Sequence, residues 1–448
     1  MKEPIISVSG LRGVIGESLS PELAMRFACA FATGLEAGPI VVTRDGRATG
    51  RMLADAIRSG LCAVSRNVID ADVAATPTTG VLLRSLQAAG AIQISASHNP
   101  SPYNGIKLFG ADGRVIVATL GEEVVERYRS GETSWVSHDQ IGVVAGCEDV
   151  IGEHLRLVLA TVDAERIRSK RFKVLLDSNH GAGSVLGRKL LESCGCELTL
   201  LGGTPDGQFE HTPEPTAENL AGVRRQVVEA GADVGFCQDP DADRLAVIDE
   251  AGRYVGEEYT LALCLDHVLR ATPGPVVTNC ATSRMSEDLA NRYGCDFHRS
   301  AVGEANVCTM MQDVNAIFGG EGNGGPIDGR VGYVRDSFVG MASILDAMAA
   351  REMKVSELAD ELPSYAIHKT KITLDHDRVP TALDAIEEHF SDATSSRQDG
   401  LRIDWPDRWL LIRASNTEPI VRIIAETPTS ADSVRLCESA ANVISADV

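Results

Sequence analysis

The sequence predicts an α/β protein made of three similar domains followed by a smaller α+β domain. The chain has 448 residues, enough for about three domains of ordinary size. A pattern of strand, polar or glycine-rich loop, and helix recurs at 38–61, 171–195 and 274–294. From about residue 369 this repeat gives way to a mixture of strands and helices. These observations together predict the fold class.

Each repeated unit is a short β-branched run followed by a loop and a helical pattern. The first reads GPIVVTRDGRATGRMLADAIRSGL, the second RFKVLLDSNHGAGSVLGRKLLESCG and the third GPVVTNCATSRMSEDLANRYG. In the first unit, apolar residues recur at helical spacing, namely Met52, Leu53, Ala56, Ile57 and Leu61. The units lie roughly a hundred residues apart, which excludes a solenoid with a period of ~20–50 residues. Loops that follow strands in such sheets are where ligands bind.

Composition excludes several classes of function. The net charge of -21 argues against a nucleic-acid binder, because phosphate backbones require a basic surface. The 11 cysteines form no CxxC pairs, which favours free thiols in a reducing compartment. The start, MKEPIISVSGLRG, does not resemble a signal peptide, and no run reaches the ~18 apolar residues of a membrane helix. We therefore expect a cytoplasmic protein without nucleic-acid or membrane partners.

The segment QDPDADRLAVIDE holds three aspartates, Asp239, Asp241 and Asp243, between two strand-like runs. If the segment is extended, alternate residues face one way and the three carboxylates converge. Converging carboxylates repel and raise each other's pKa values. Mg²⁺, with few protein oxygens and an outside phosphate ligand, removes that cost best. The alternatives are a solvated acidic turn and an EF-hand, which Arg244 disfavours because it stands where that loop requires glycine.

Three further loops offer groups suited to phosphates and sugars. RASNTEP, residues 413–419, supplies a guanidinium, hydroxyls and an amide for a phosphate dianion, or is a simple capping turn. In GGEGNGGP, residues 319–326, the glycines let the backbone approach a ligand, and Glu321 and Asn323 could bond sugar hydroxyls. A flexible surface loop is the alternative there. SGLRG, residues 9–13, places Arg12 between glycines.

The stretch ISASHNP, residues 94–100, follows a buried strand and continues as SPYNGIKLFG. A hydrolase serine would need a G-x-S-x-G elbow with a histidine base. Here His98 directly follows Ser97, so in an extended segment its side chain points away and a Ser–His dyad is poorly supported. A phosphorylated Ser97 would instead offer oxygens to the metal. Lys107 follows closely enough to reach a transferring group.

In chain order, SGLRG, ISASHNP with NGIKLF, DPDADR, GEGNGG and RASNTEP resemble the motifs of the α-D-phosphohexomutase superfamily. The resemblance covers the whole chain. It implies three similar mixed-sheet α/β domains plus a C-terminal α+β domain around a central cleft, with limits expected at 1–150, 151–252, 253–368 and 369–448. It also implies that an enzyme phosphoserine donates its phosphoryl group to a hexose monophosphate. The bound hexose 1,6-bisphosphate then reverses its orientation in the site and returns its other phosphate to the serine. The net reaction interconverts the sugar 1-phosphate and 6-phosphate.

The resemblance assigns a role to each matching residue. Ser97 matches the phosphoserine, which with Asp239, Asp241 and Asp243 would hold one Mg²⁺ per chain. Lys107 matches a residue that acts as general acid/base, and His98 matches a residue that shapes the serine loop. Arg12 and Arg244 match cations near the transferring phosphoryl group. Glu321 and Asn323 match the loop that reads sugar hydroxyls. The loop for the distal phosphate matches Arg413, Ser415, Asn416 and Thr417.

The sequence departs from the phosphomannomutase/phosphoglucomutase group in its sugar loop. That loop reads like GE-x-S-G-H, whereas here Asn323 replaces the serine and Gly325 the histidine. In VGEANV, Glu304 stands where that group has a histidine. With an acidic residue at this position, the loop resembles that of phosphoglucosamine mutases, where a carboxylate could favour the 2-ammonium group of glucosamine. RASNTEP in turn differs from the RPSGTEP of the usual bacterial phosphoglucosamine mutase.

The leading hypothesis is a Mg²⁺-dependent mutase that interconverts glucosamine 6-phosphate and glucosamine 1-phosphate, with a hexose 1,6-bisphosphate as activator. The alternative within the class is a phosphomannomutase/phosphoglucomutase. A non-enzymatic sugar-phosphate-binding paralogue, disfavoured by the intact Ser97, Lys107 and aspartates, and a phosphatase are the rivals from other classes. The expected partners are small-molecule sugar phosphates, with a monomer or homodimer as the assembly.

Overall fold

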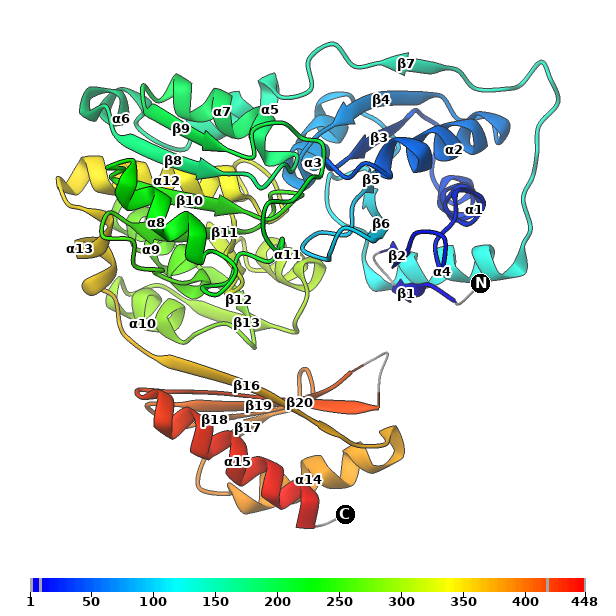
Figure 1. Ribbon diagram of the computed structural model, residues 1–448. Helices are drawn as coiled ribbons and strands as arrows, with labels where there is room; N and C mark the ends of the chain where they lie inside the picture. Colours follow the sequence, from blue (N-terminus) through cyan, green and yellow to red (C-terminus); the bar gives the residue numbers. More distant parts are fainter. Residues whose placement is uncertain (1–2, 8–9, 416–418, 447–448) are drawn as a thin grey trace.

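The computed structural model describes residues 3–7, 10–415 and 419–446 (Figure 1). The described chain forms four sheets, each with its own helices. The first three sheets are mixed and the fourth is antiparallel, which confirms the predicted fold class. The predicted domain limits stay a prediction. None of the described helices is both long enough and apolar enough to cross a bilayer.

The first sheet has the strand order β1-β2-β6-β5-β3-β4-β7, with β3 parallel to its neighbours and β6 antiparallel to β5 and β2. Helix α1 begins with a proline after Ser20, whose hydroxyl accepts the N–H of Leu23. The elements are β1 (Ile5–Ser7), β2 (Gly10–Val14), α1 (Pro21–Thr33), β3 (Ile40–Arg44), α2 (Gly50–Ala63), β4 (Val68–Val73), α3 (Thr76–Ser85), β5 (Gly90–Ile94), β6 (Tyr103–Gly110), α4 (Ala118–Ser130) and β7 (Val144–Gly146).

The second sheet has the order β11-β10-β8-β9, and the third has the order β13-β12-β14-β15. In each, a parallel core carries one antiparallel edge hairpin. The second contains α5 (Gly152–Leu159), α6 (Ala164–Lys170), β8 (Lys173–Asp177), α7 (Gly183–Ser193), β9 (Glu197–Leu201), α8 (Ala221–Glu229), β10 (Val234–Gln238) and β11 (Leu245–Asp249). The third contains α9 (Glu257–Ala271), β12 (Val276–Asn279), α10 (Met285–Arg292), β13 (Phe297–Ser300), α11 (Glu304–Asp313), β14 (Phe318–Glu321), β15 (Gly325–Ile327), α12 (Ser337–Arg351) and α13 (Val355–Asp360).

The fourth sheet has the antiparallel order β16-β20-β19-β18-β17. Helices α14 and α15 lie on the side of this sheet that faces away from the rest of the molecule (Figure 1). The sheet's other face is therefore turned toward the third domain. The elements are β16 (Ala366–Thr373), η1 (His376–Arg378), α14 (Val379–His389), β17 (Thr394–Ser396), β18 (Leu401–Asp404), β19 (Trp409–Ala414), β20 (Ile420–Thr427) and α15 (Ser430–Ala446).

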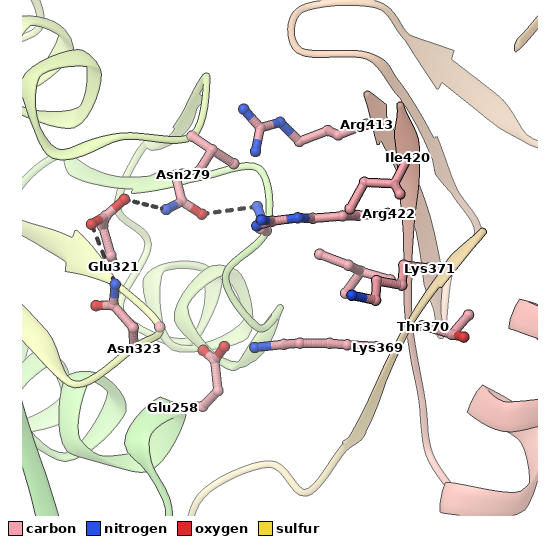
Figure 2. A pocket seen from close by; sticks show the side chains of 14 residues that line it. Glu258, Asn279, Glu321, Asn323, Lys369, Thr370, Lys371, Arg413, Ile420 and Arg422 are labelled. Atoms are coloured by element: carbon pink, nitrogen blue, oxygen red, sulfur yellow. Dashed lines mark hydrogen bonds between the residues drawn. The ribbon is translucent and has the colours of Figure 1, made fainter. Parts of the chain in front are cut away.

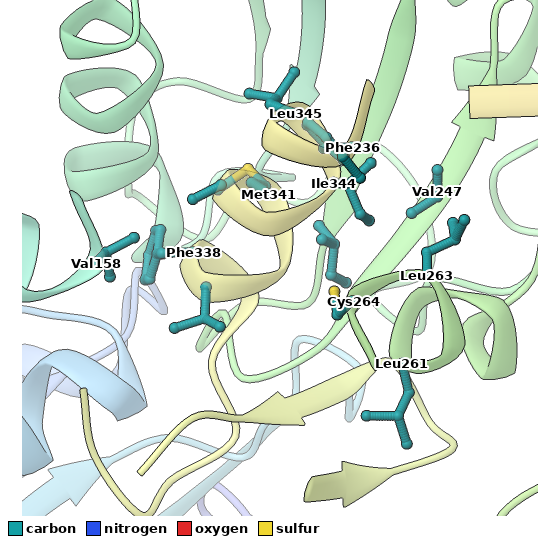
Figure 3. Close-up of a cluster of buried hydrophobic side chains, with 14 of the residues drawn as sticks. Val158, Phe236, Val247, Leu261, Leu263, Cys264, Phe338, Met341, Ile344 and Leu345 are labelled. Carbon is teal, nitrogen blue, oxygen red and sulfur yellow. The ribbon is translucent and has the colours of Figure 1, made fainter. Parts of the chain in front are cut away.

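The repeat in the sequence corresponds to β3–α2, β8–α7 and β12–α10. The second and third domains nevertheless share one hydrophobic core rather than packing separately. Figure 3 shows Phe236 and Val247 of the second sheet beside Cys264 of α9 and Met341 of α12. Helix α12 is buried along almost its whole length because both domains pack on it. The loops that these two domains carry are therefore held on one rigid support.

Candidate active site

The serine loop lies between β5 and β6, with the Ser97 side chain only 2% exposed. Ser97 has a φ of 50°, a left-handed conformation that costs a non-glycine residue about 1 kcal/mol or more. The loop is held from outside. Arg47 donates to the carbonyls of Ser97 at 2.7 Å and of Asn99 at 2.6 Å, and Ser95 Oγ accepts the Ser97 N–H at 2.9 Å. Asp45 binds both Arg47 and Ser95.

The conformation of Ser97 corrects the expected position of His98. The segment is not extended, and Ser97 Oγ lies 3.3 Å from His98 Nδ1, so the prediction that the histidine points away was wrong. Burial, together with the nearby Arg244 and Arg12, lowers the pKa of His98 to about 3. The imidazole is therefore neutral at pH 7 and can share a hydrogen bond with the serine without adding charge.

The three aspartates lie in the turn that joins β10 to β11, and all are fully buried. The sequence analysis assumed an extended segment, but Ala242 takes a left-handed φ of 57° and the segment turns. The carboxylates still converge, with one oxygen of each lying within 4.8 Å of the others. Ser97 Oγ donates to Asp239 Oδ2 at 2.9 Å. The serine loop and the aspartate loop thus form one site.

The charge of the aspartate loop is only partly balanced by the protein. Lys107 Nζ donates to Asp241 at 3.1 Å and to Asp243 at 3.0 Å. Burial and repulsion from the other two carboxylates raise the pKa of Asp239. For Asp243, burial also raises the pKa, but Arg335, Lys107 and Arg244 outweigh it and hold the pKa below its ordinary value. Burial lowers the pKa of Lys107, yet the facing carboxylates outweigh it and raise that pKa.

Two oxygens of this cluster fit a hard cation. Asp241 Oδ1 and Asp243 Oδ1 are buried and have no hydrogen-bond partner within the part of the chain that the structure describes. An unpartnered buried carboxylate oxygen is costly unless a cation meets it. Three carboxylates with the hydroxyl of Ser97 beside them are the oxygen ligands that Mg²⁺ prefers. The residues present could therefore hold Mg²⁺.

A cavity of about 710 Å³ opens between the third and fourth domains (Figure 2). Glu321 on its third-domain wall is firmly held, because Asn279 donates to Oε1 and Arg335 to Oε2, both at 2.7 Å. Asn323 Oδ1 is buried and has no protein partner among the described residues, so it is available to a ligand hydroxyl. The polar and charged lining residues are Glu258, Asn279, Glu321, Asn323, Lys369, Thr370, Lys371, Arg413 and Arg422.

The fourth-domain wall of the cavity is a row of cations. Arg413 lies opposite Arg422 across β19 and β20, and Lys371 lies opposite Arg422 across β16 and β20. Lys369, two residues before Lys371, lies on the same face of β16 (Figure 2). Like charges directly opposite each other destabilise a sheet. Asp399 pairs with Arg413 at 2.7 Å, which leaves the rest of the row suited to a phosphate dianion.

The other residues singled out from the sequence lie near these two sites. Arg12, on β2, is close enough to the aspartate loop for Asp241 and Asp243 to act on its pKa, which burial lowers. The Arg244 N–H donates to Asp239 at 3.2 Å. Ser415 is nearly buried at the end of β19, whereas Asn416 and Thr417 lie outside the described residues.

Glu304 lies at the start of α11 and is almost fully buried. Its Oε1 accepts the backbone N–H of Arg335 at 2.6 Å and lies 3.7 Å from Arg335 Nε. This carboxylate is therefore tied to Arg335 through Oε1.

Four family models cover almost the entire chain. They are the phosphoglucomutase/phosphomannomutase α/β/α domains I, II and III at 4–134, 153–252 and 257–365, and the C-terminal domain at 372–443. The chain belongs to this phosphohexomutase family. Its members are mutases that isomerise sugar phosphates. The four matched domains follow the same order along the chain as the four sheets.

Individual phosphohexomutases match over nearly their full length. A Thermococcus kodakarensis "Phosphoglucomutase/phosphomannomutase" is 38% identical over 93% of both chains. A Methanopyrus kandleri "Probable phosphoglucosamine mutase" is 32% identical over 93% of this chain and 92% of its own. The crystal structure of a Burkholderia thailandensis phosphoglucomutase/phosphomannomutase family protein matches with a TM-score of 0.86 and 26% identity, covering 99% of this chain and 98% of that one.

Sequence reasoning missed several residues of this phosphohexomutase site. Arg47 lies in the loop after β3 and Asn279 is the last residue of β12, so the repeat itself could have indicated both. Thr76, which donates to Asp241 at 2.6 Å, opens a helix in another domain and carried no local signal. Arg335 and Glu258 lie in segments without a motif, and only the tertiary structure brings them to the site.

Replacing Glu258 with glutamine is expected to raise the melting temperature at pH 9 but not at pH 4. Burial raises the pKa of Glu258 to about 8, whereas the unfolded chain ionises it near ~4.3. Between these values the unfolded state has lost a proton that the folded state keeps, so wild-type stability falls as the pH rises. Glutamine does not ionise and so avoids this decrease in the free energy of unfolding. We expect the decrease in the wild type to be about 1–2 kcal/mol, because water in the cavity screens the charge. Calorimetry across this range measures it, and an equal change at both pH values would contradict the burial argument.

Proposed function

We propose that this phosphohexomutase interconverts glucosamine 6-phosphate and glucosamine 1-phosphate through a phosphorylated Ser97. One observation carries the proposal. The guanidinium of Arg335 contacts both Asp243 of the aspartate loop, at 2.6 Å, and Glu321 of the sugar loop, at 2.7 Å. A sugar bound at Glu321 therefore lies on the side of Arg335 opposite the aspartate loop, which Ser97 contacts through Asp239, while its other end faces the cations of the fourth domain.

Each group of the chain has a role in this proposal. The row of Lys369, Lys371, Arg413 and Arg422 binds the phosphate that does not react, and Glu321 and Asn323 orient the sugar hydroxyls. Mg²⁺, when bound by the three aspartates, supplies neutralisation of the charge on the transferring phosphoryl oxygens. In the first transfer the sugar hydroxyl oxygen bonds to phosphorus and the bond from phosphorus to Ser97 Oγ breaks. Lys107, held beside the same carboxylates, would give its Nζ proton to Ser97 Oγ, and the neutral amine would then take up the proton of the sugar hydroxyl. The reverse transfer uses the same groups after the sugar turns over.

Glucosamine is favoured as the sugar by the glycine-rich loop GEGNGG and by Glu304. The second oxygen of Glu304 could meet a 2-ammonium group, since Arg335 takes only the first. Relatives named as probable phosphoglucosamine mutases support this choice. Glucose or mannose phosphate is the second candidate, because the Thermococcus kodakarensis relative at 38% identity carries the phosphoglucomutase/phosphomannomutase name.

A panel of sugars tests the proposed substrate. With Mg²⁺ and a hexose 1,6-bisphosphate activator, kcat/KM is measured for glucosamine 6-phosphate, glucose 1-phosphate and mannose 1-phosphate. We expect a preference for glucosamine of about a hundredfold, or about 2.7 kcal/mol of transition-state discrimination. A preference for glucose 1-phosphate or mannose 1-phosphate would contradict the glucosamine proposal and support a phosphoglucomutase/phosphomannomutase.

Glu304→Gln is the matched variant for the same panel. Glutamine keeps the carbonyl oxygen that accepts from Arg335 but removes the charge that would attract an ammonium group. We expect kcat/KM for glucosamine 6-phosphate to fall by about tenfold while that for glucose 1-phosphate changes less than about threefold. An equal fall for both sugars would show that Glu304 acts only through Arg335.

A further inference from the structure

Gly325 and Arg335 compete for one space. A Cβ placed on Gly325 would lie 2.4 Å from Arg335 Cδ and 2.8 Å from Arg335 Cγ, closer than unbonded carbons approach. Any side chain at residue 325 is therefore incompatible with Arg335 where it stands. The side chain of Arg335 enters from another segment and fills the space that a side chain at residue 325 would take.

The contacts of Arg335 join the two halves of the site. One Nη donates to Asp243 Oδ2 at 2.6 Å, and the other donates to Glu321 Oε2 at 2.7 Å. The residue is 8% exposed, and its Nε has no hydrogen-bond partner within the described residues. Because a guanidinium is planar and rigid, its two donors hold the two carboxylates at one fixed separation.

The backbone around Arg335 is equally constrained. Its N–H donates to Glu304, and the next residue, Asp336, caps α12 by accepting from the N–H groups of Phe338 and Val339. The Asp336 N–H donates to the carbonyl of Pro326, the last residue of the sugar loop, which lies in β15. Arg335 is thus anchored to the shared core of the second and third domains, which keeps its guanidinium in place.

We propose that Arg335 is a positioning residue of the mutase reaction, which occupies the space beside Gly325 and fixes the sugar loop to the aspartate loop. The role deepens the proposed function and rests on it for its kinetic consequence. Without the guanidinium, Glu321 loses its arginine partner and Asp243 keeps Lys107 at 3.0 Å, so the side-chain link between the two carboxylates is lost and the loops are held less firmly. A displacement of about 1 Å between sugar and phosphoryl group can cost about a hundredfold in rate.

Arg335→Lys gives the kinetic test, because lysine keeps the charge but cannot donate to both carboxylates in a fixed geometry. We expect kcat to fall by about 10–100-fold while KM changes less than about threefold, since the phosphate contacts of the fourth domain are untouched. Arg330→Ala is the matched control, because this half-exposed arginine pairs with Asp328 on the same loop. An unchanged kcat in Arg335→Lys would overturn the proposal.

A paired exchange separates positioning from general stability. Gly325→His alone should collide with Arg335 and lose activity, whereas Gly325→His combined with Arg335→Ala removes the collision. We expect the double variant to have a kcat at least about tenfold above either Gly325→His or Arg335→Ala. Melting temperatures of all variants are compared at the same time. A double variant that regains stability but no activity would contradict a role in the reaction.

Hydrogen exchange tests the lock without any substrate. In the wild type, Mg²⁺ alone should slow exchange in the aspartate loop, residues 239–244, and also in the sugar loop, residues 319–326, because Arg335 connects them. In Arg335→Lys the slowing in the sugar loop should be clearly smaller, although the Leu245 N–H still donates to the Gly324 carbonyl at 2.8 Å. Equal protection of the sugar loop in both proteins, or none in the wild type, would overturn the proposal. Because no sugar is present, this result stands apart from a failure of the substrate panel.

Discussion

Replacing Ser97 with alanine is expected to reduce kcat by at least about 1,000-fold, with no turnover above background. The Ser97 hydroxyl donates to Asp239 of the aspartate loop at 2.9 Å, and Arg47 holds the left-handed Ser97 through its carbonyl. If Ser97 carries the phosphoryl group, no other residue can replace it, because the geometry would be lost with the nucleophile.

The measurement is steady-state turnover with a hexose 1,6-bisphosphate activator. Ser101→Ala is the matched control, because this exposed serine lies on the same loop and should retain wild-type activity. Melting temperatures should agree within a few degrees, since Ser97 Oγ makes only part of the loop's hydrogen bonds. If Ser97→Ala kept more than about a tenth of wild-type kcat, the serine would not be the phosphate carrier.

Mg²⁺ is expected to stabilise the wild-type protein, and chelation is expected to remove its activity. A ligand that binds only the folded state adds about 2.7 kcal/mol when present at a hundred times its Kd. The buried Asp241 Oδ1 and Asp243 Oδ1, which lack protein partners among the described residues, are the atoms that gain most. The increase in melting temperature with Mg²⁺ measures this gain.

Asp241→Asn should abolish the response to Mg²⁺ and lower kcat by about 100-fold or more. It removes one of three charges while keeping the size of the side chain. Asp313→Asn, at an exposed position on the surface, should leave both quantities unchanged. An Asp241→Asn protein with the full Mg²⁺ shift would show that the metal binds elsewhere.

The fold class and the two loops of the active site could be predicted from the sequence. Strand periodicity and motif order are local properties, and they indicate where the loops after β5 and β10 begin. Local backbone conformation could not be predicted in the same way. Ser97 and Ala242 both take left-handed φ values that their residue types disfavour, so an extended chain was the wrong assumption for each loop.

The residues that connect the loops could not be predicted, because they depend on tertiary structure. Arg335 reaches Asp243 across 92 positions of sequence, and it fits only because residue 325 is glycine. The sequence shows the glycine but not which side chain fills its space. Likewise, the row of cations at Lys371, Arg413 and Arg422 arises from the register of three strands. Each member alone resembles an ordinary surface charge.

Phosphopeptide mapping tests the central claim most directly. The wild-type protein is incubated with Mg²⁺ and a hexose 1,6-bisphosphate, digested, and analysed by mass spectrometry before and after a chase with a sugar monophosphate. We expect one phosphoryl group on Ser97 that disappears during the chase at a rate consistent with kcat. A phosphoryl group on another residue, or continued turnover with Ser97 unmodified throughout, would contradict phosphoryl transfer through this serine.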